Sequence, residues 1–399
     1  MYTRPSITSF LVAAAAAALL PACADGLPRS EPGDVADIAE SAESALNLDP
    51  CALANPMDIR VPAQCPTLTA AVARISNGGT IRLAAGDYTE NVSVTNKAVN
   101  ILGAGMDTTR IIGASAQTPA ILLGGIASAS ISAVTIRGGS AGIEARSVLG
   151  IKSQGLTVSN VRFTATPYGV LGDFLGSVFI GQSTIQGTTR GIQLRSVGDL
   201  DVIQSTVMGG GQGGLFVNAP TATAGCLIYL DGVQQSLSGS IGAVFTGRGC
   251  PVTIRNSSFN LNNHAGLYFD QSGNADVGST HIGYAYPTAD GRYGDGILDS
   301  GTVLRVHDSV IEDASRAGVS VFGCSAAAPG TNPASVALAN TRIDRAGFDI
   351  DVERAIVHPT SSAACPAGST SPGLSDLGGN VCNGAECHAE SSILAPLAL

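Results

Sequence analysis

A glycine followed by an apolar, a polar and an apolar residue recurs through most of this chain, and the repeat constrains the fold strongly. The glycines are Gly142, Gly169, Gly191, Gly214, Gly242, Gly266, Gly296, Gly318 and Gly347, with spacings of 27, 22, 23, 28, 24, 30, 22 and 29 residues. Alternation with a period of two is typical of a β-strand. Asn-Gly and Asp-Gly pairs are too few to close a hairpin in every repeat, so a period of this length with about three short strands predicts a parallel β-helix.

A small polar pair follows the second strand of most repeats. The pairs are Ser159-Asn160, Gln182-Ser183, Gln204-Ser205, Asn256-Ser257, Asp308-Ser309 and Asn340-Thr341. The next opening glycine lies 9 or 10 residues after Asn160, Gln182, Gln204, Asn256 and Asp308. One half of the repeat is therefore constant, and the other half carries the loops. We expect the pairs to hydrogen-bond backbone at tight turns and the glycines to supply positive φ at the corners.

The residues one and three positions after each glycine are predicted to point into the core. They are Ile143/Ala145, Ile192/Leu194, Leu215/Val217, Ala243/Phe245, Leu267/Phe269, Val319/Val321 and Phe348/Ile350. Asp299 breaks this apolar column, and an inward carboxylate is costly unless it is paired. The outward residue between the inward pair is apolar in four successive repeats, at Phe216, Val244, Tyr268 and Leu298. This stripe predicts either a partner surface or a face covered by the C-terminal segment.

The start of the body has its own pattern. Leu68, Ala71, Val72 and Ile75 fall on one face of a helix, which ends at the Asn-Gly-Gly of residues 77–79. The segment LTAAVARISNGGTIRLAAGDYTENVSVTNKAVNILGAG resembles the N-terminal capping helix and first coil of pectin methylesterases and related proteins. The chain is thus similar to the pectin lyase-like family. The resemblance implies an all-β fold, a single-stranded right-handed parallel β-helix with a capping helix, over residues 51–357.

The N-terminus is typical of an exported protein. Residues 1–22 have Arg4, a short apolar run and a processing site, so we expect a signal peptide. Leu20 to Cys23 resembles a bacterial lipobox, which implies a lipidated Cys23; ordinary signal-peptidase cleavage nearby is the alternative. Ala24 follows Cys23, which by resemblance implies an outer-membrane anchor in a Gram-negative host, on the periplasmic face or the cell surface. Residues 23–50 are rich in acids and predict a solvated tether.

Cysteine number fits an oxidising compartment. With Cys23 set aside for lipid, eight cysteines remain. We expect neighbours to pair, as Cys51–Cys65, Cys226–Cys250, Cys324–Cys365 and Cys382–Cys387. Three of these cysteines lie in residues 358–399, which we expect to be a C-terminal tail. The net charge of −10 argues against a nucleic-acid partner.

The catalytic sequence signatures of pectin methylesterases are incomplete in this chain. Gln182-Ser183-Thr184-Ile185 has serine where the family has an aspartate, and Asp173-Phe174-Leu175-Gly176 is only a weak echo of a second signature. A lyase is the enzymatic alternative, because it needs carboxylates for calcium and a base for a sugar proton. Asp295 and Asp299 could hold the cation, with Arg305 or His307 as the base and Asp308 nearby. The competing interpretation is that these acids lie on turns of an acidic protein.

Aromatic residues gather in the same part of the chain. The candidate ligand-binding residues are Tyr268, Tyr284, Tyr286, Arg292 and Tyr293. Tyrosine beside acid and amide groups suits sugar rings, which offer CH faces and hydroxyls; packing within loops is the alternative.

These features predict an envelope-anchored β-helix lipoprotein that binds carbohydrate or is structural, with a polysaccharide as its possible partner. It requires no cofactor or metal, although calcium is possible for a lyase. Two alternatives stay open: a polysaccharide lyase or hydrolase using residues 268–313, and an adhesion protein that binds another protein. The sequence leaves the oligomeric state undetermined.

Overall fold

The computed structural model describes residues 51–147, 155–219, 226–247, 250–287, 293–322, 334–353, 356–358, 361–364 and 372–390. The chain divides into the units Met1–Leu48 and Asp49–Leu399, and every described residue belongs to the second unit. The expected signal peptide, Cys23, Arg292, Cys324 and Cys365 lie outside the described residues. Within the described ranges, no helix is long and apolar enough to cross a bilayer.

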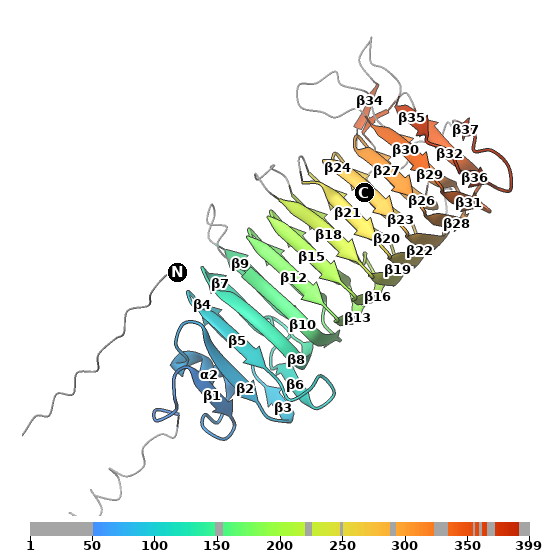
Figure 1. The fold of residues 1–399 in the computed structure, drawn as a ribbon. Helices are drawn as coiled ribbons and strands as arrows, with labels where there is room; N and C mark the ends of the chain where they lie inside the picture. Colours follow the sequence, from blue (N-terminus) through green and yellow to red (C-terminus); the bar gives the residue numbers. More distant parts are fainter. Residues whose placement is uncertain are drawn as a thin grey trace, which may run out of the picture. The chain divides into compact units, whose positions relative to one another are not determined.

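The second unit is a stack of parallel β-coils, as predicted, and successive coils lie side by side from the blue to the red end of Figure 1. Most coils contribute one strand to each of three parallel sheets, and the longer strands β8 and β10 turn the corner between the first two sheets.

Sheet I consists of β1 (Asp58–Val61), β2 (Gly79–Leu83), β5 (Ala98–Leu102), the first part of β8 (Ser128–Gly138) and of β10 (Gly155–Thr164), β12 (Ser177–Gly181), β15 (Asp199–Ile203), β18 (Leu227–Asp231), β21 (Val252–Arg255), β24 (Asn274–Gly278), β27 (Val303–His307), β30 (Ser335–Ala339) and β35 (Gly373–Asp376). Sheet II consists of β3 (Gly86–Thr89), β6 (Thr109–Gly113), the second part of β8 and of β10, β13 (Thr184–Thr188), β16 (Thr206–Gly210), β19 (Gln234–Ser238), β22 (Ser258–Asn262), β25 (His281–Ala285), β28 (Val310–Ala314), β31 (Arg342–Asp344) and β36 (Val381–Cys382). Sheet III consists of β4 (Val92–Thr95), β7 (Ile121–Gly125), β9 (Ile143–Ser147), β11 (Tyr168–Asp173), β14 (Arg190–Arg195), β17 (Leu215–Asn218), β20 (Ile241–Thr246), β23 (Ala265–Asp270), β26 (Asp295–Ser300), β29 (Ala317–Phe322), β32 (Phe348–Glu353) and β37 (Ala389–Glu390).

The N-terminal coil is capped by the predicted helix. Helix α2 (Leu68–Arg74) buries Leu68, Ala71 and Val72, and the Thr67 side chain accepts the Ala70 N–H at its N-terminus. Such a cap satisfies one of the free amide groups of the first turn. The helix lies against β1, β2 and β4.

The inward columns are confirmed, with one correction. The inward pairs from Ile143/Ala145 to Val319/Val321 are at most 1% exposed, and Asp299 occupies the same column between Phe269 and Val321. The pair assigned to the last repeat was wrong, because Val319 aligns with Ile350 rather than with Phe348. Ile350 and Val352 are therefore the inward pair of β32, and the glycine-based register slips there by two residues.

The repeated glycines have a different role from the expected one, because none of them has a positive φ. A Cβ at Gly169, Gly191 or Gly214 would lie 2.5–2.7 Å from the carbonyl oxygen of the corresponding glycine in the next coil. The column is glycine because adjacent backbones approach too closely for any side chain.

Positive φ instead occurs in the small polar pairs. Gln182, Gln204, Asn256 and Asp308 have φ between 46° and 50°. Their serine neighbours are buried and hydrogen-bond between coils: the Ser183 N–H donates to Ser205 Oγ at 3.2 Å, and that hydroxyl donates to the Ile203 carbonyl at 2.9 Å. The predicted hydrogen bonding of the turn columns is thus confirmed.

The coils continue beyond residue 357, where we placed the end of the β-helix. Strands β35, β36 and β37 pair in parallel with β30, β31 and β32 and add a coil that reaches Glu390. Between these coils, β33 (Ile356–His358) and β34 (Ser361–Ala364) form an antiparallel pair, and β33 lies against β29.

Three expected disulfides are present, Cys51–Cys65, Cys226–Cys250 and Cys382–Cys387. The fourth expected pair, Cys324–Cys365, lies outside the described residues and stays a prediction.

Candidate functional site

The outer surface of sheet III carries a cleft among its described residues. A cleft of about 390 Å³ lies across β9, β11 and β14. Its lining consists of Glu144, Ala145, Arg146, Tyr168, Leu171, Gly172, Asp173, Gln193 and Arg195. Carboxylate, amide, guanidinium and phenol groups thus converge on one concavity, with Leu171 as an apolar patch between them.

Strand register places these groups in columns. Glu144, Leu171 and Gln193 are aligned on neighbouring strands, and each is the outward residue between two core residues. Arg146, Asp173 and Arg195 form the adjacent column, in which one carboxylate separates two guanidinium groups. Tyr168 aligns with Arg190 on the other side of the floor.

The floor of the cleft is held rigidly by burial. Glu144 and Gln193 are each only 4% exposed although they line the cleft. The Glu144 carboxylate pairs with Arg146, whose side chain is largely exposed. Arg190 Nη1 donates to Gln193 Oε1 at 2.7 Å, and its guanidinium lies 5.2 Å from the centre of the Phe216 ring. The site is therefore a buried polar floor with exposed cations at its rim.

The cleft ends where the outer surface of sheet III becomes covered. Phe216 packs against a cluster of buried residues consisting of Ile241, Val244, Ala265, Tyr268, Tyr293, Leu298 and Phe322. Tyr293 stacks on His264 with ring centres 4.8 Å apart. The apolar stripe from Val244 to Leu298 is thus buried, which argues against an open partner surface. Cover by the C-terminal segment stays a prediction.

Both proposed cation ligands, Asp295 and Asp299, are fully buried. Asp295 lies under the covered part of sheet III, where Arg316 donates to both of its oxygens. Ser320 and Asp351 complete this buried network: the Ser320 hydroxyl donates to Asp295 Oδ1 at 2.7 Å, and Arg316 Nη1 lies 3.1 Å from Asp351 Oδ2. Burial raises the pKa of Asp295 to about 6, while Arg316 opposes the shift.

Asp299 points into the core and not toward Asp295. It aligns with Phe269 and Val321, is 0% exposed, and its Oδ1 accepts the Thr302 N–H at 3.2 Å. Among the described residues, its Oδ2 has no hydrogen-bond partner. Burial raises the pKa of Asp299 well above its usual range, so the side chain favours the protonated form.

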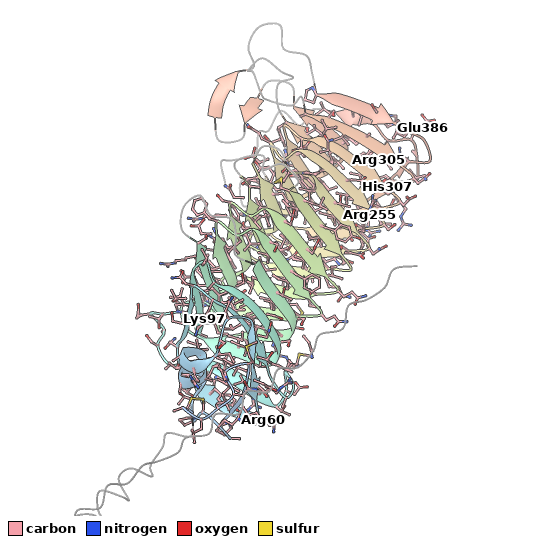
Figure 2. All side chains as sticks on the ribbon, turned by 60° about the vertical axis from the view of Figure 1, so that its left-hand side comes forward. Arg60, Lys97, Arg255, Arg305, His307 and Glu386 are labelled. Carbon is pink, nitrogen blue, oxygen red and sulfur yellow. A yellow bond between two sulfur atoms is a disulfide. The ribbon has the colours of Figure 1, made fainter. Side chains whose placement is uncertain are left out.

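The proposed bases lie on a different sheet. Arg305 and His307 share the outer surface of β27, where Figure 2 shows them beside Arg255. His307 Nδ1 donates to Asp308 Oδ2 at 2.7 Å, and Nε2 lies 3.3 Å from Asp276 Oδ1. Arg255 contacts both His307 and Asp276.

A glycine makes this sheet I cluster possible. Gly278 lies between Arg255 and His307 in the strand register. A Cβ at Gly278 would lie 2.0 Å from Arg255 Nη1 and 2.5 Å from His307 Cε1. The structure therefore brings Arg305, His307 and Asp308 together, joins them to Arg255 and Asp276, and places them on a different sheet from Asp295 and Asp299.

The tyrosines do not form one surface. Tyr268 and Tyr293 are each 3% exposed, and burial raises the pKa of Tyr268. Tyr284 and Tyr286, at 43% and 45%, are exposed at the end of β25. Arg292 lies outside the described residues.

Sequence reasoning missed the cleft residues Glu144, Tyr168, Gln193, Arg146 and Arg195. A signal was available, because polar residues occupy the outward position at Glu144 and Gln193, in the two repeats that flank the repeat of Leu171. Among the residues with described positions, no group of three or more His, Cys, Asp or Glu side chains is arranged to hold a metal ion.

Comparisons with known proteins identify the architecture. No protein-family model and no curated protein sequence matches the chain. The A-module of mannuronan C-5 epimerase AlgE4 from Azotobacter vinelandii is similar in structure, with a TM-score of 0.57, 15% identity, and coverage of 78% of this chain and 88% of that one. The catalytic unit of a GH87 α-1,3-glucanase from Streptomyces thermodiastaticus strain HF3-3 has a TM-score of 0.53, 12% identity, and coverage of 81% and 68%. The AlgE6 A-module of Azotobacter vinelandii has a TM-score of 0.50 and 14% identity, and covers 76% of this chain and 90% of that one. The chain therefore has the right-handed parallel β-helix fold of pectin lyase-like proteins.

Proposed function

We propose that the protein binds a polysaccharide in the sheet III cleft. The observation that carries this proposal is the buried polar floor, in which Glu144 and Gln193 are almost completely covered by protein yet line a concavity of about 390 Å³. Pockets that combine a few fixed polar groups with apolar surface are typical of small-molecule sites. The structurally similar proteins named above are an epimerase of mannuronan and a glucanase, which supports a carbohydrate as the ligand class.

The chemistry of the lining suits sugar rings. Glu144 accepts hydrogen bonds from hydroxyl groups, Gln193 and Tyr168 both donate and accept, and Leu171 offers an apolar contact for a CH face. Arg146 and Arg195 at the rim are matched by Asp173 and Glu144, so the formal charges of the lining cancel. The exposed guanidinium groups can still bind the carboxylates of uronic acids, and the similarity to a mannuronan epimerase makes an acidic polysaccharide the first ligand to test.

Binding to immobilised glycans tests this proposal. We expect Gln193→Ala and Glu144→Gln to weaken binding by about tenfold, because one lost hydrogen bond to the ligand is worth about 1–1.5 kcal/mol. Gln186→Ala on the outer surface of β13 is the matched control, since it makes the same change on sheet II. Equal binding by all four proteins would contradict the cleft as the site.

The proposed location is the outer membrane, with Cys23 as the lipid anchor and residues 23–50 as the tether. The lipobox-like sequence Leu20 to Cys23 and the disulfides outside it support export to an oxidising compartment. Metabolic labelling with palmitate is expected for the wild type and not for Cys23→Ser. Labelling that persists in the variant would exclude this anchor.

A second candidate function is polysaccharide cleavage at the sheet I cluster. It is favoured by His307, which lies between Asp308 and Asp276 with Arg255 and Arg305 nearby, as an acid-base group would require. Incubation with uronic-acid polysaccharides, with and without calcium, would release unsaturated products that disappear in His307→Ala. Absence of products across the panel would count against a lyase.

A further inference from the structure

We propose that the sheet III cleft is closed at one end and binds the terminus of a glycan chain rather than an internal stretch. This inference rests on the proposed function and specifies which part of the polysaccharide the cleft receives. It is carried by a change along one column of outward residues, from residues that line the cleft to apolar residues that pack in a cluster.

The change is seen in the outward residues of sheet III from coil to coil. Ser93 on β4 is exposed and Leu122 on β7 is half-buried. Glu144 and Gln193 form the buried cleft floor, with half-buried Leu171 between them. From Val244 to Asp351 the outward residues of the column are at most 8% exposed, and Leu298, Ser320 and Asp351 are all 0% exposed. The cleft lining ends at Gln193, and the next two positions of the column, Phe216 and Val244, pack in the apolar cluster.

The boundary is a packed wall. Arg190 holds Gln193 by a hydrogen bond and lies over the Phe216 ring, and Phe216 in turn packs against the cluster that contains Val244, Tyr268 and Tyr293. Opening a passage through these residues would expose buried aromatic and aliphatic side chains to water. Burial of apolar side chains stabilises a folded protein, so the wall is stable in the free protein.

The part of this column from β4 to β14, which we call the open lane, runs across the strands. The cleft lining comes from three neighbouring coils, so its long direction follows the axis of the β-helix. From β4 to β14 the lane crosses four strand spacings, or about 19 Å at about 4.8 Å per spacing. A glycan in this lane must stop at Arg190 and Phe216, because the continuation of the lane is occupied by protein.

Stoichiometry separates end binding from internal binding. We would titrate the protein with alginate and polygalacturonate, each as a tetramer, an octamer and the full-length polymer, by isothermal titration calorimetry. End binding predicts the same number of proteins per chain for all lengths of a given series. Affinity expressed per chain end should also stay constant between the octamer and the polymer.

Variants distinguish this inference from the proposed function. Arg190→Ala, at the closed end, should weaken octamer and polymer by the same factor, with Gln186→Ala as the control. If the number of proteins per chain rises with polymer length while Gln193→Ala still weakens binding, end recognition is wrong and the proposed function stands. If no length of either glycan binds, and immobilised glycans also fail, the proposed function falls and this inference with it.

Discussion

Arg316 donates to both carboxylate oxygens of Asp295, with Nε–Oδ1 at 2.9 Å and Nη2–Oδ2 at 3.0 Å, in a position where both side chains are buried. Asp351 on the next strand accepts from the same guanidinium. One cation therefore compensates two buried carboxylates beneath the cover of sheet III.

Removal of this cation should be strongly destabilising. Arg316→Met leaves two buried carboxylates uncompensated, and breaking a buried pair in this way costs about 3–5 kcal/mol of unfolding free energy. Urea unfolding followed by circular dichroism measures the loss. Arg82→Met is the matched control, because its pair with Asp58 is exposed and should contribute much less. Equal losses in both variants would show that the network has no special role.

Asp299 should make the protein less stable as the pH rises. The pKa of Asp299 is higher in the folded protein than in the unfolded chain, because burial disfavours the carboxylate. The contribution of Asp299 to the unfolding free energy is therefore fully present below about pH 4 and is lost as the pH rises through the folded pKa. Asp299→Asn keeps the shape and removes the titration. We expect the unfolding free energy of the variant relative to wild type to increase between pH 5 and pH 9, by at most about 1.4 kcal/mol per pH unit. A difference that does not change with pH would contradict a protonated core carboxyl group.

The glycine column should not accept alanine. A Cβ at Gly214 would lie 2.5 Å from the Gly242 carbonyl oxygen, so Gly214→Ala must push two coils apart. Overpacking of this kind costs about 1–3 kcal/mol. Gly211→Ala is the control, because a Cβ there meets no atom within 4 Å and the residue does not have a positive φ. Thermal unfolding should separate the two variants, and a stable Gly214→Ala protein would refute the proposed reason for glycine.

The remaining disulfide can be tested by mass. Non-reducing peptide mapping of the mature protein should recover Cys324 linked to Cys365, besides the three pairs already described. A free thiol at either position, or a link to another cysteine, would overturn the pairing by neighbours.

The fold was predictable from the sequence because the repeat acts at short range. Alternation around Ile192 and Leu194 sets which side chains enter the core, and the interval between the polar pair and the glycine sets the coil. The register failed at Phe348, where a glycine two positions early imitates the repeat. The role of the glycines was also misjudged, since close approach between coils depends on neighbours more than 20 residues away.

The site was harder to predict because it depends on which faces are covered. Asp295, Arg305 and His307 are close in sequence, yet they lie on sheet III and sheet I, since one coil turns through all three sheets. Glu144 and Gln193 are separated by 49 residues and share a column only after the coils stack. An outward polar residue such as Glu144 looks like ordinary surface until the structure shows it buried within a cleft.

The central claim is that the cleft across β9, β11 and β14 receives a sugar chain. A crystal structure of the protein soaked with an alginate or polygalacturonate octamer tests it most directly. The account predicts sugar density over Glu144, Leu171 and Gln193, with a chain terminus at Arg190. Density confined to the sheet I surface around His307, with an empty cleft, would contradict it.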